Sequence, residues 1–130
     1  MARIWVMISG VSGGLAVGLG AFGAHGLKAV LSAPMMSAFE TGNRYHMFHT
    51  LALLGTSAWM DRFPAEGQAA KGLGVVAGLF AGGMVLFSGS LYVMAVTGWT
   101  WLGMATPFGG LAWIVAWGQL VWVFARLPSR

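Results

Sequence analysis

Three histidines are the residues of this chain best suited to chemistry. His25 ends a long apolar run, whereas His46 and His49 stand at the start of the next apolar run. Because His46 and His49 are three residues apart, a helix would place them on neighbouring positions of one face. Together with His25 on the preceding helix they could bind a metal ion, and His25 and His49 could alternatively ligate a haem.

The surrounding residue types favour a structural role over a metal or haem site. The chain has no cysteine, which excludes disulfides, thiolate ligands and cysteine nucleophiles. No acidic residue lies inside an apolar run to serve as a further ligand or to orient an imidazole. We therefore expect no resident metal or cofactor, and we expect His25 and His49 to hydrogen-bond across the helix ends. A bound metal, haem, lipid or quinone head group stays as the alternative.

Other polar side chains are expected on the same side of the membrane as these histidines. They give a predicted polar pocket that consists of His25, His49, Tyr92, Ser88, Ser90, Glu40 and Thr106. The Ser88-Gly89-Ser90 segment is not a nucleophile elbow, because it lies within a helix and has no evident acid–base partner on the same side beyond the histidines and Glu40. The sequence therefore does not predict an enzyme.

The composition is that of an integral membrane protein. Of the 130 residues, 58% are hydrophobic and only 8% are charged, against roughly 25% charged residues in a soluble domain. The net charge of +4 comes from basic residues at the edges of apolar runs. Membrane topology places basic residues there, so we do not expect nucleic-acid binding.

Hydropathy divides the chain into four predicted transmembrane helices within one domain, residues 1–130. The expected spans are residues 4–27, 45–60, 72–96 and 106–125. The first apolar run is too long for a signal peptide, so we expect it to be retained. Between the first two spans, residues 28–44 have an amphipathic pattern and Pro34 at a helix start, which predicts a connector lying at the membrane interface. The alternative is that this helix continues without a break into the second span. The predicted class is an all-α integral membrane protein.

Two spans carry glycines repeated every four residues, which is typical of close helix packing in membranes. The expected packing residues are Gly10, Gly14 and Gly18 in the first span and Gly74, Gly78 and Gly82 in the third. They could pack within the chain, against a membrane-protein partner, or against another copy in a homo-oligomer.

Four spans put both termini on one side of the membrane. Arg3, Arg62, Lys71, Arg126 and Arg130 fall on that side, and Lys28 and Arg44 fall on the other. The positive-inside rule therefore predicts cytoplasmic termini. This orientation places the predicted polar pocket on the outer side.

Several motifs resemble those of a known family. They are residues 20–25 (GAFGAH), Phe39-Glu40-Thr41 leading to residues 48–52 (FHTLA), residues 86–92 (LFSGSLY), and residues 106–110 (TPFGG) with Trp117. In this order they are similar to the YgdD-like family, domain of unknown function 423, whose animal relatives are called transmembrane protein 256. The resemblance implies a small polytopic protein of the bacterial inner membrane and brings no activity. The chain departs from the family pattern at His46, where some members have glutamine, and at Gly42-Asn43, where small apolar residues are usual.

The function expected first is a non-enzymatic accessory or scaffold protein that packs against membrane partners. The alternative is a ligand-binding membrane protein that uses the His/Tyr/Ser pocket, and a third is a small-solute channel formed by an oligomer. The histidines are expected near the end of the second span, away from the membrane midplane, which argues against an ion-driven carrier.

Overall fold

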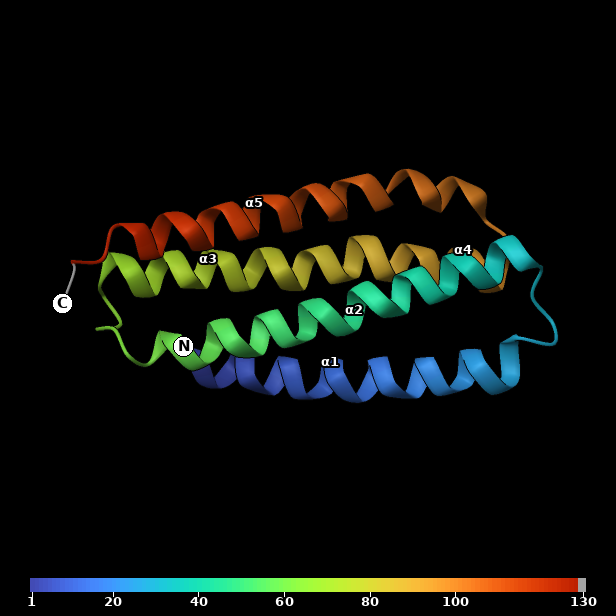
Figure 1. The fold of residues 1–130 in the computed structure, drawn as a ribbon, viewed down its shortest axis with the longest axis horizontal. Helices are drawn as coiled ribbons and strands as arrows, with labels where there is room; N and C mark the ends of the chain where they lie inside the picture. Colours follow the sequence, from blue (N-terminus) through green and yellow to red (C-terminus); the bar gives the residue numbers. More distant parts are fainter. Residues whose placement is uncertain (129–130) are drawn as a thin grey trace.

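The computed structural model describes residues 1–128 and consists of four long helical units lying side by side (Figure 1). Close packing links α1 to α2, α2 to α3 and α4, and α3 to α5. This confirms the all-α, four-helix class. Two π-helical segments (η1, η2) and one 3-10 segment (η3) extend or join the α-helices. The bounds are α1 Ala2–Phe22, η1 Gly23–Leu27, α2 Ala33–Met60, α3 Gln68–Gly83, η2 Met84–Gly89, α4 Ser90–Thr97, η3 Thr100–Met104 and α5 Thr106–Ala125.

Three of the four units are long and apolar enough to cross a bilayer on length and composition alone. They are Ala2–Leu27, Gln68–Thr97 and Thr100–Ala125. The fourth unit, α2, carries Glu40 and Arg44 near its start and runs beside the others as one helix of 28 residues (Figure 1). At 1.5 Å per residue α2 is about 42 Å long, more than the roughly 30 Å of hydrocarbon that a span must cross.

Local sequence explains where the helices begin and end. Pro34 and Pro107 lie in the first turns of α2 and α5, where proline's missing N–H costs nothing. Gly98 ends α4 with φ of 73°, a left-handed conformation that glycine adopts without strain. The helix α1 begins at the same end of the bundle at which α5 ends (Figure 1). Arg130, one of the basic residues used above to orient the chain, lies outside the described residues.

For residues 33–44 the structure shows a helix that continues without a break into the second span, which was one of the two expectations, and not a separate interfacial connector. The connection is short, and residues 33–44 form the first turns of α2. The apolar side of this segment packs against other helices of the bundle. Phe39 is 2% exposed and belongs to a buried cluster with Leu27 and Ala95, and Gly42 lies against Leu91 of α4. An amphipathic pattern cannot distinguish this burial from burial at the membrane interface.

The predicted glycine positions do not make the close helix contacts within this chain. A Cβ atom added at Gly10, Gly14, Gly18, Gly78 or Gly82 would meet nothing within 4 Å, and one at Gly74 would only reach the Met1 sulfur at 4.0 Å. Other glycines take this role. A Cβ at Gly109 would lie 2.5 Å from the backbone nitrogen of Phe87, and one at Gly83 would overlap the Trp113 indole.

The main core lies between α2, α3 and α5. Phe80, Leu53 and Leu73 are fully buried there. The indole nitrogen of Trp113 donates a hydrogen bond of 3.1 Å to the Phe80 carbonyl. Because Gly83 has no side chain, the indole can lie directly against α3. On the other side of the bundle, α1 packs along α2. The side of α1 that faces α3 is therefore available to form a groove.

Candidate functional site

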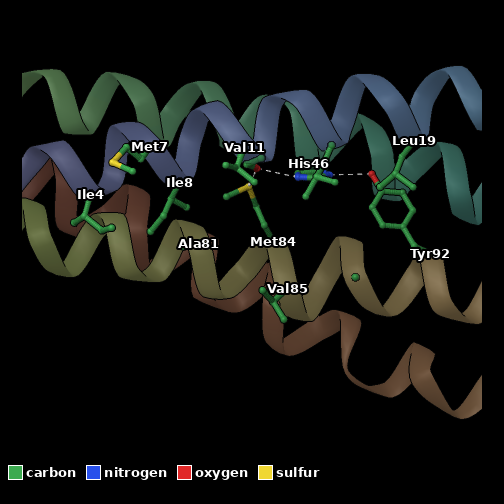
Figure 2. A pocket seen from close by; sticks show the side chains of 13 residues that line it. Ile4, Met7, Ile8, Val11, Leu19, His46, Ala81, Met84, Val85 and Tyr92 are labelled. Atoms are coloured by element: carbon green, nitrogen blue, oxygen red, sulfur yellow. Dashed lines mark hydrogen bonds between the residues drawn. The ribbon is translucent and has the colours of Figure 1, made fainter.

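A lateral groove runs between α1 and the α3–η2–α4 unit, with a volume of about 580 Å³ (Figure 2). One wall is formed by apolar side chains of α1, and the other by small or apolar residues of α3 and η2. The side chain of His46, from α2, lies at the bottom between the two walls. We call this the lateral groove, and its lining residues are Ile4, Met7, Ile8, Val11, Ser12, Leu15, Leu19, His46, Ala81, Met84, Val85, Gly89 and Tyr92.

His46 joins three helices through hydrogen bonds to both of its ring nitrogens. Nε2 lies 2.9 Å from the Ser12 hydroxyl of α1, and Nδ1 lies 3.1 Å from the Tyr92 hydroxyl of α4. Figure 2 shows both contacts as dashed lines. His46 is only 8% exposed. A single buried imidazole therefore connects the two walls of the groove across its floor.

The hydrogen bonds continue beyond His46 in both directions. Ser12 Oγ lies 2.6 Å from Thr50 Oγ1, and both hydroxyls lie within 3.5 Å of the Met84 sulfur. At the other end, the Asn43 amide donates to the Tyr92 hydroxyl at 3.2 Å and to the Ala16 carbonyl at 2.7 Å. Ser12, Asn43, His46, Thr50, Met84 and Tyr92 together form what we call the polar network.

The polar network lies near the middle of the bundle's length. Ser12 is close to the centre of the 26-residue unit Ala2–Leu27, and Met84 is close to the centre of the 30-residue unit Gln68–Thr97. His46 is likewise near the centre of the 28-residue α2. Because α2 begins at Ala33, His46 lies well inside this helix and not at its start, unlike in the expected span of residues 45–60. The position of His46 therefore no longer argues against a transport role, and polar groups deep within a membrane protein are usually functional.

His49 lies on a different side of α2 and takes no part in the polar network. Its ring stacks on Trp113 with 3.6 Å between centroids and 3° between planes. Nδ1 lies 2.8 Å from the Tyr45 carbonyl, which can only accept, so Nδ1 carries the proton. Nε2 then accepts from the Trp117 indole at 3.4 Å. Both ring nitrogens are used within the protein, which supports a structural role for His49.

The remaining predicted pocket residues are dispersed. His25 is exposed in η1 and is not brought to His49, because about 24 Å of α2 separates His49 from the start of that helix. Glu40 is exposed and lines a second hollow, of about 560 Å³, with Gly20, Phe39 and Arg44. Tyr92 alone of the predicted set enters the polar network. The structure therefore does not form the predicted pocket.

The predicted hydroxyl residues divide into a hydrogen-bonded pair and one buried group without a partner. Ser90 donates to the Phe87 carbonyl at 2.8 Å, so Thr106 is the donor in the 2.9 Å contact that ties α5 to α4. Ser88 is 1% exposed, and its hydroxyl oxygen has no hydrogen-bond partner among the described residues. Ser88 belongs to η2, and π-helical segments inside longer helices often mark functional sites.

Sequence reasoning missed Ser12, Asn43 and Thr50 and gave His46 little weight. A usable signal was present on α2, where Asn43, His46 and Thr50 recur at three- and four-residue intervals on one face. A glutamine at position 46, which the family resemblance implies for some members, would also offer a donor and an acceptor to bridge two hydroxyls. The family departure at His46 is therefore compatible with an important structural position.

The fold and the groove define a small helical membrane protein with a polar network enclosed between its helices. The chain belongs to the family described as "Protein of unknown function (DUF423)", which matches residues 19–110. This range contains His46 and Tyr92, whereas Ser12 precedes it.

Whole-chain relatives support this assignment. The chain is 39% identical over 120 residues to the UPF0382 membrane protein YwdK of Bacillus subtilis (strain 168). The matched region covers 92% of this chain and 94% of that protein. It is 35% identical over 129 residues to the UPF0382 inner membrane protein YgdD of Escherichia coli (strain K12). The matched region covers 99% of this chain and 95% of that protein. No solved structure matches the chain.

Proposed function

We propose that this chain is a non-enzymatic protein that binds an amphipathic, lipid-soluble molecule in the lateral groove. The observation that carries the proposal is the opening of a buried polar network into an apolar groove between α1 and α3. The groove volume of about 580 Å³ is within the roughly 300–1,000 Å³ range of small-molecule sites. The apolar part of the ligand lies against α1 and α3, and its head group reaches His46, Ser12 or Tyr92.

A non-enzymatic role is proposed although Ser12 and His46 are 2.9 Å apart, a distance that also suits a nucleophile and its base. The group on the far side of the imidazole is the Tyr92 phenol, which lacks the negative charge that stabilises an imidazolium in a catalytic triad. Ser12 also lies within α1, where the helix ladder occupies the backbone N–H groups that an oxyanion hole needs.

For the location, we propose the cytoplasmic membrane of a bacterium with both termini in the cytoplasm. The Escherichia coli relative is described as an inner membrane protein. Arg3, Arg62, Lys71 and Arg126 fall at the end of the bundle where α1 begins and α5 ends. Basic residues concentrate on the cytoplasmic side of membrane proteins.

The test is to extract the full chain gently from its membrane and to identify co-purifying molecules by native mass spectrometry. A phenylalanine at Ala81 fills the lateral groove, whereas a phenylalanine at the exposed Gly118 of α5 projects into lipid. We expect the unsubstituted chain and Gly118→Phe to retain a discrete molecule and Ala81→Phe to lose it. Equal retention of the same lipids by all three proteins would contradict groove binding.

A second candidate function, packing against a membrane partner, is favoured by the outward position of the α1 glycines. Gly10 and Gly14 are exposed and Gly18 faces open space, a surface that another helix can approach closely. Gly14→Leu is expected to leave the chain folded and to weaken association with a partner or another copy. Unchanged co-purification and unchanged oligomer size for Gly14→Leu would count against this second function.

A further inference from the structure

We infer that the head group bound in the lateral groove is an uncharged carbonyl, carried on an isoprenoid or acyl chain, that accepts a hydrogen bond from Tyr92. This inference rests on the proposed function and specifies the chemical class of its ligand. Three properties of the site lead to it: the charge of the lining, the direction of the hydrogen bonds, and the depth of the polar floor.

The lining excludes a charged head group. The groove is lined by no Asp, Glu, Lys or Arg, and its ionisable side chains are His46 and Tyr92. A phosphate or ammonium group at this depth would therefore lack a counter-charge in a medium where an unpaired charge costs several kcal/mol or more. A neutral head group with oxygen atoms avoids this cost.

The hydrogen bonds of the polar network can be arranged in two directions around His46. In the first, Tyr92 donates to Nδ1, Nε2 donates to Ser12, and Ser12 donates to Thr50. Thr50 then donates to the Met84 sulfur at 3.4 Å. Every donor is used, but the last acceptor is a thioether, which is a weak one.

In the second arrangement each of these hydrogen bonds runs in the opposite direction, so that donor and acceptor exchange roles. Thr50 donates to Ser12, Ser12 donates to Nε2, and Nδ1 donates to the Tyr92 oxygen, which already accepts from Asn43. The Tyr92 O–H is then free to donate to a group in the groove that it lines. A ligand carbonyl at that point replaces the weak bond to sulfur by a stronger bond to oxygen.

The depth and size of the site suit a long-chain carbonyl compound. The Tyr92 hydroxyl lies 3.1 Å from His46, near the centre of α2, and in a membrane-spanning bundle bilayer phosphates do not reach this depth. The groove accommodates a ring or the first part of a chain, and the rest can leave between α1 and α3 into lipid. Isoprenoid quinones and fatty-acyl esters share this chemistry, and the binding test below separates them.

The reversal can be measured by nitrogen-15 NMR of histidine-labelled full chain in lipid nanodiscs. We expect His46 to carry its proton on Nε2 in ligand-free protein and on Nδ1 after saturation with decylubiquinone or methyl dodecanoate. His49 is the internal control, because the Tyr45 carbonyl holds its proton on Nδ1 throughout. A bound carbonyl ligand that leaves the His46 tautomer unchanged would overturn the inference.

A binding panel separates this inference from the proposed function. It compares decylubiquinone, methyl dodecanoate, dodecane and dodecyl phosphate by native mass spectrometry. We expect at least one carbonyl compound to bind about tenfold more tightly than dodecane or dodecyl phosphate. The carbonyl compound that binds more tightly shows whether the head group belongs to an isoprenoid quinone or to a fatty-acyl ester. Tyr92→Phe should weaken carbonyl binding about three- to tenfold, whereas Tyr45→Phe, on the α5-facing side of α2, should not.

The outcomes of the panel are distinguishable. If dodecane or dodecyl phosphate binds as well as the carbonyl compounds, or if Tyr92→Phe has no effect, the carbonyl inference is wrong and groove binding stands. If none of the four binds and no molecule co-purifies, the proposed function fails as well.

Discussion

The imidazole of His46 and the phenol of Tyr92 are joined by a hydrogen bond of 3.1 Å between α2 and α4. The same imidazole reaches Ser12 of α1 through its other nitrogen. The helix α1 packs mainly along α2, and His46, together with Asn43 and the Ser12–Met84 contact, also ties α1 to the opposite wall of the groove. The His46 side chain therefore contributes to stability and to the chemistry of the groove floor.

Removing the polar character of His46 should destabilise the bundle. His46→Leu leaves the buried hydroxyls of Ser12 and Tyr92 without their shared partner, and we expect the free energy of unfolding to fall by about 1–3 kcal/mol. His46→Gln keeps a donor and an acceptor at this position and should cost less than about 1 kcal/mol. Both values can be measured by unfolding the proteins in increasing concentrations of a denaturing detergent while their helix content is monitored. Equal losses for Leu and Gln would contradict the bridging role.

Two adjacent glycines of α3 should respond oppositely to alanine. A Cβ at Gly83 would overlap the Trp113 indole, so Gly83→Ala should cost about 1–3 kcal/mol. Gly82 has open space around it, and Gly82→Ala should be neutral or slightly stabilising because alanine favours a helix. The same unfolding assay compares them, and equal effects would show that Trp113 does not pack against Gly83.

The burial of Phe39 distinguishes a helix packed into the bundle from an interfacial connector. Phe39 is 2% exposed, whereas Phe48 on the same helix is 59% exposed. Phe39→Ala should therefore lower the free energy of unfolding by about 3–5 kcal/mol, and Phe48→Ala should change it by less than about 1 kcal/mol. If both variants unfold like the unsubstituted chain, residues 33–44 do not pack as α2 shows.

The predicted orientation can be tested with reporters at three positions. A fluorescent protein that folds only in the cytoplasm should be active when fused at either terminus. Alkaline phosphatase, which needs an oxidising compartment, should be active when inserted after Val30, between η1 and α2. The reverse pattern of activities would show that the termini lie outside.

The architecture could be predicted because hydropathy reports directly on burial in lipid. The long runs free of charge required four helices, and proline and glycine marked several of their ends. The helix start at Pro34 was predicted, but residues 28–44 were expected at the membrane interface because Glu40 and Arg44 resemble interfacial residues. Their neighbours Phe39 and Gly42 face α4, and periodicity does not reveal what a face packs against.

The candidate site could be predicted only in part because it depends on helix pairing. Tyr92 and the histidines were recognised as chemically capable residues. Which of them meet depends on the rotation of α2, which directs His46 towards α1 and α4 and His49 towards Trp113. Helix rotation in turn depends on close approaches such as Gly109 against Phe87. Such approaches become visible only when the helices are placed together.

Photo-crosslinking from within the lateral groove tests ligand binding most directly. A benzophenone amino acid replaces either Val85, which lines the groove, or Ile114, which is exposed on α5. Both proteins are irradiated in native membranes and analysed by mass spectrometry. Groove binding predicts one discrete adduct, carrying a carbonyl head group and a long apolar chain, at position 85 and not at position 114. The same mixture of bulk phospholipids at both positions would contradict it.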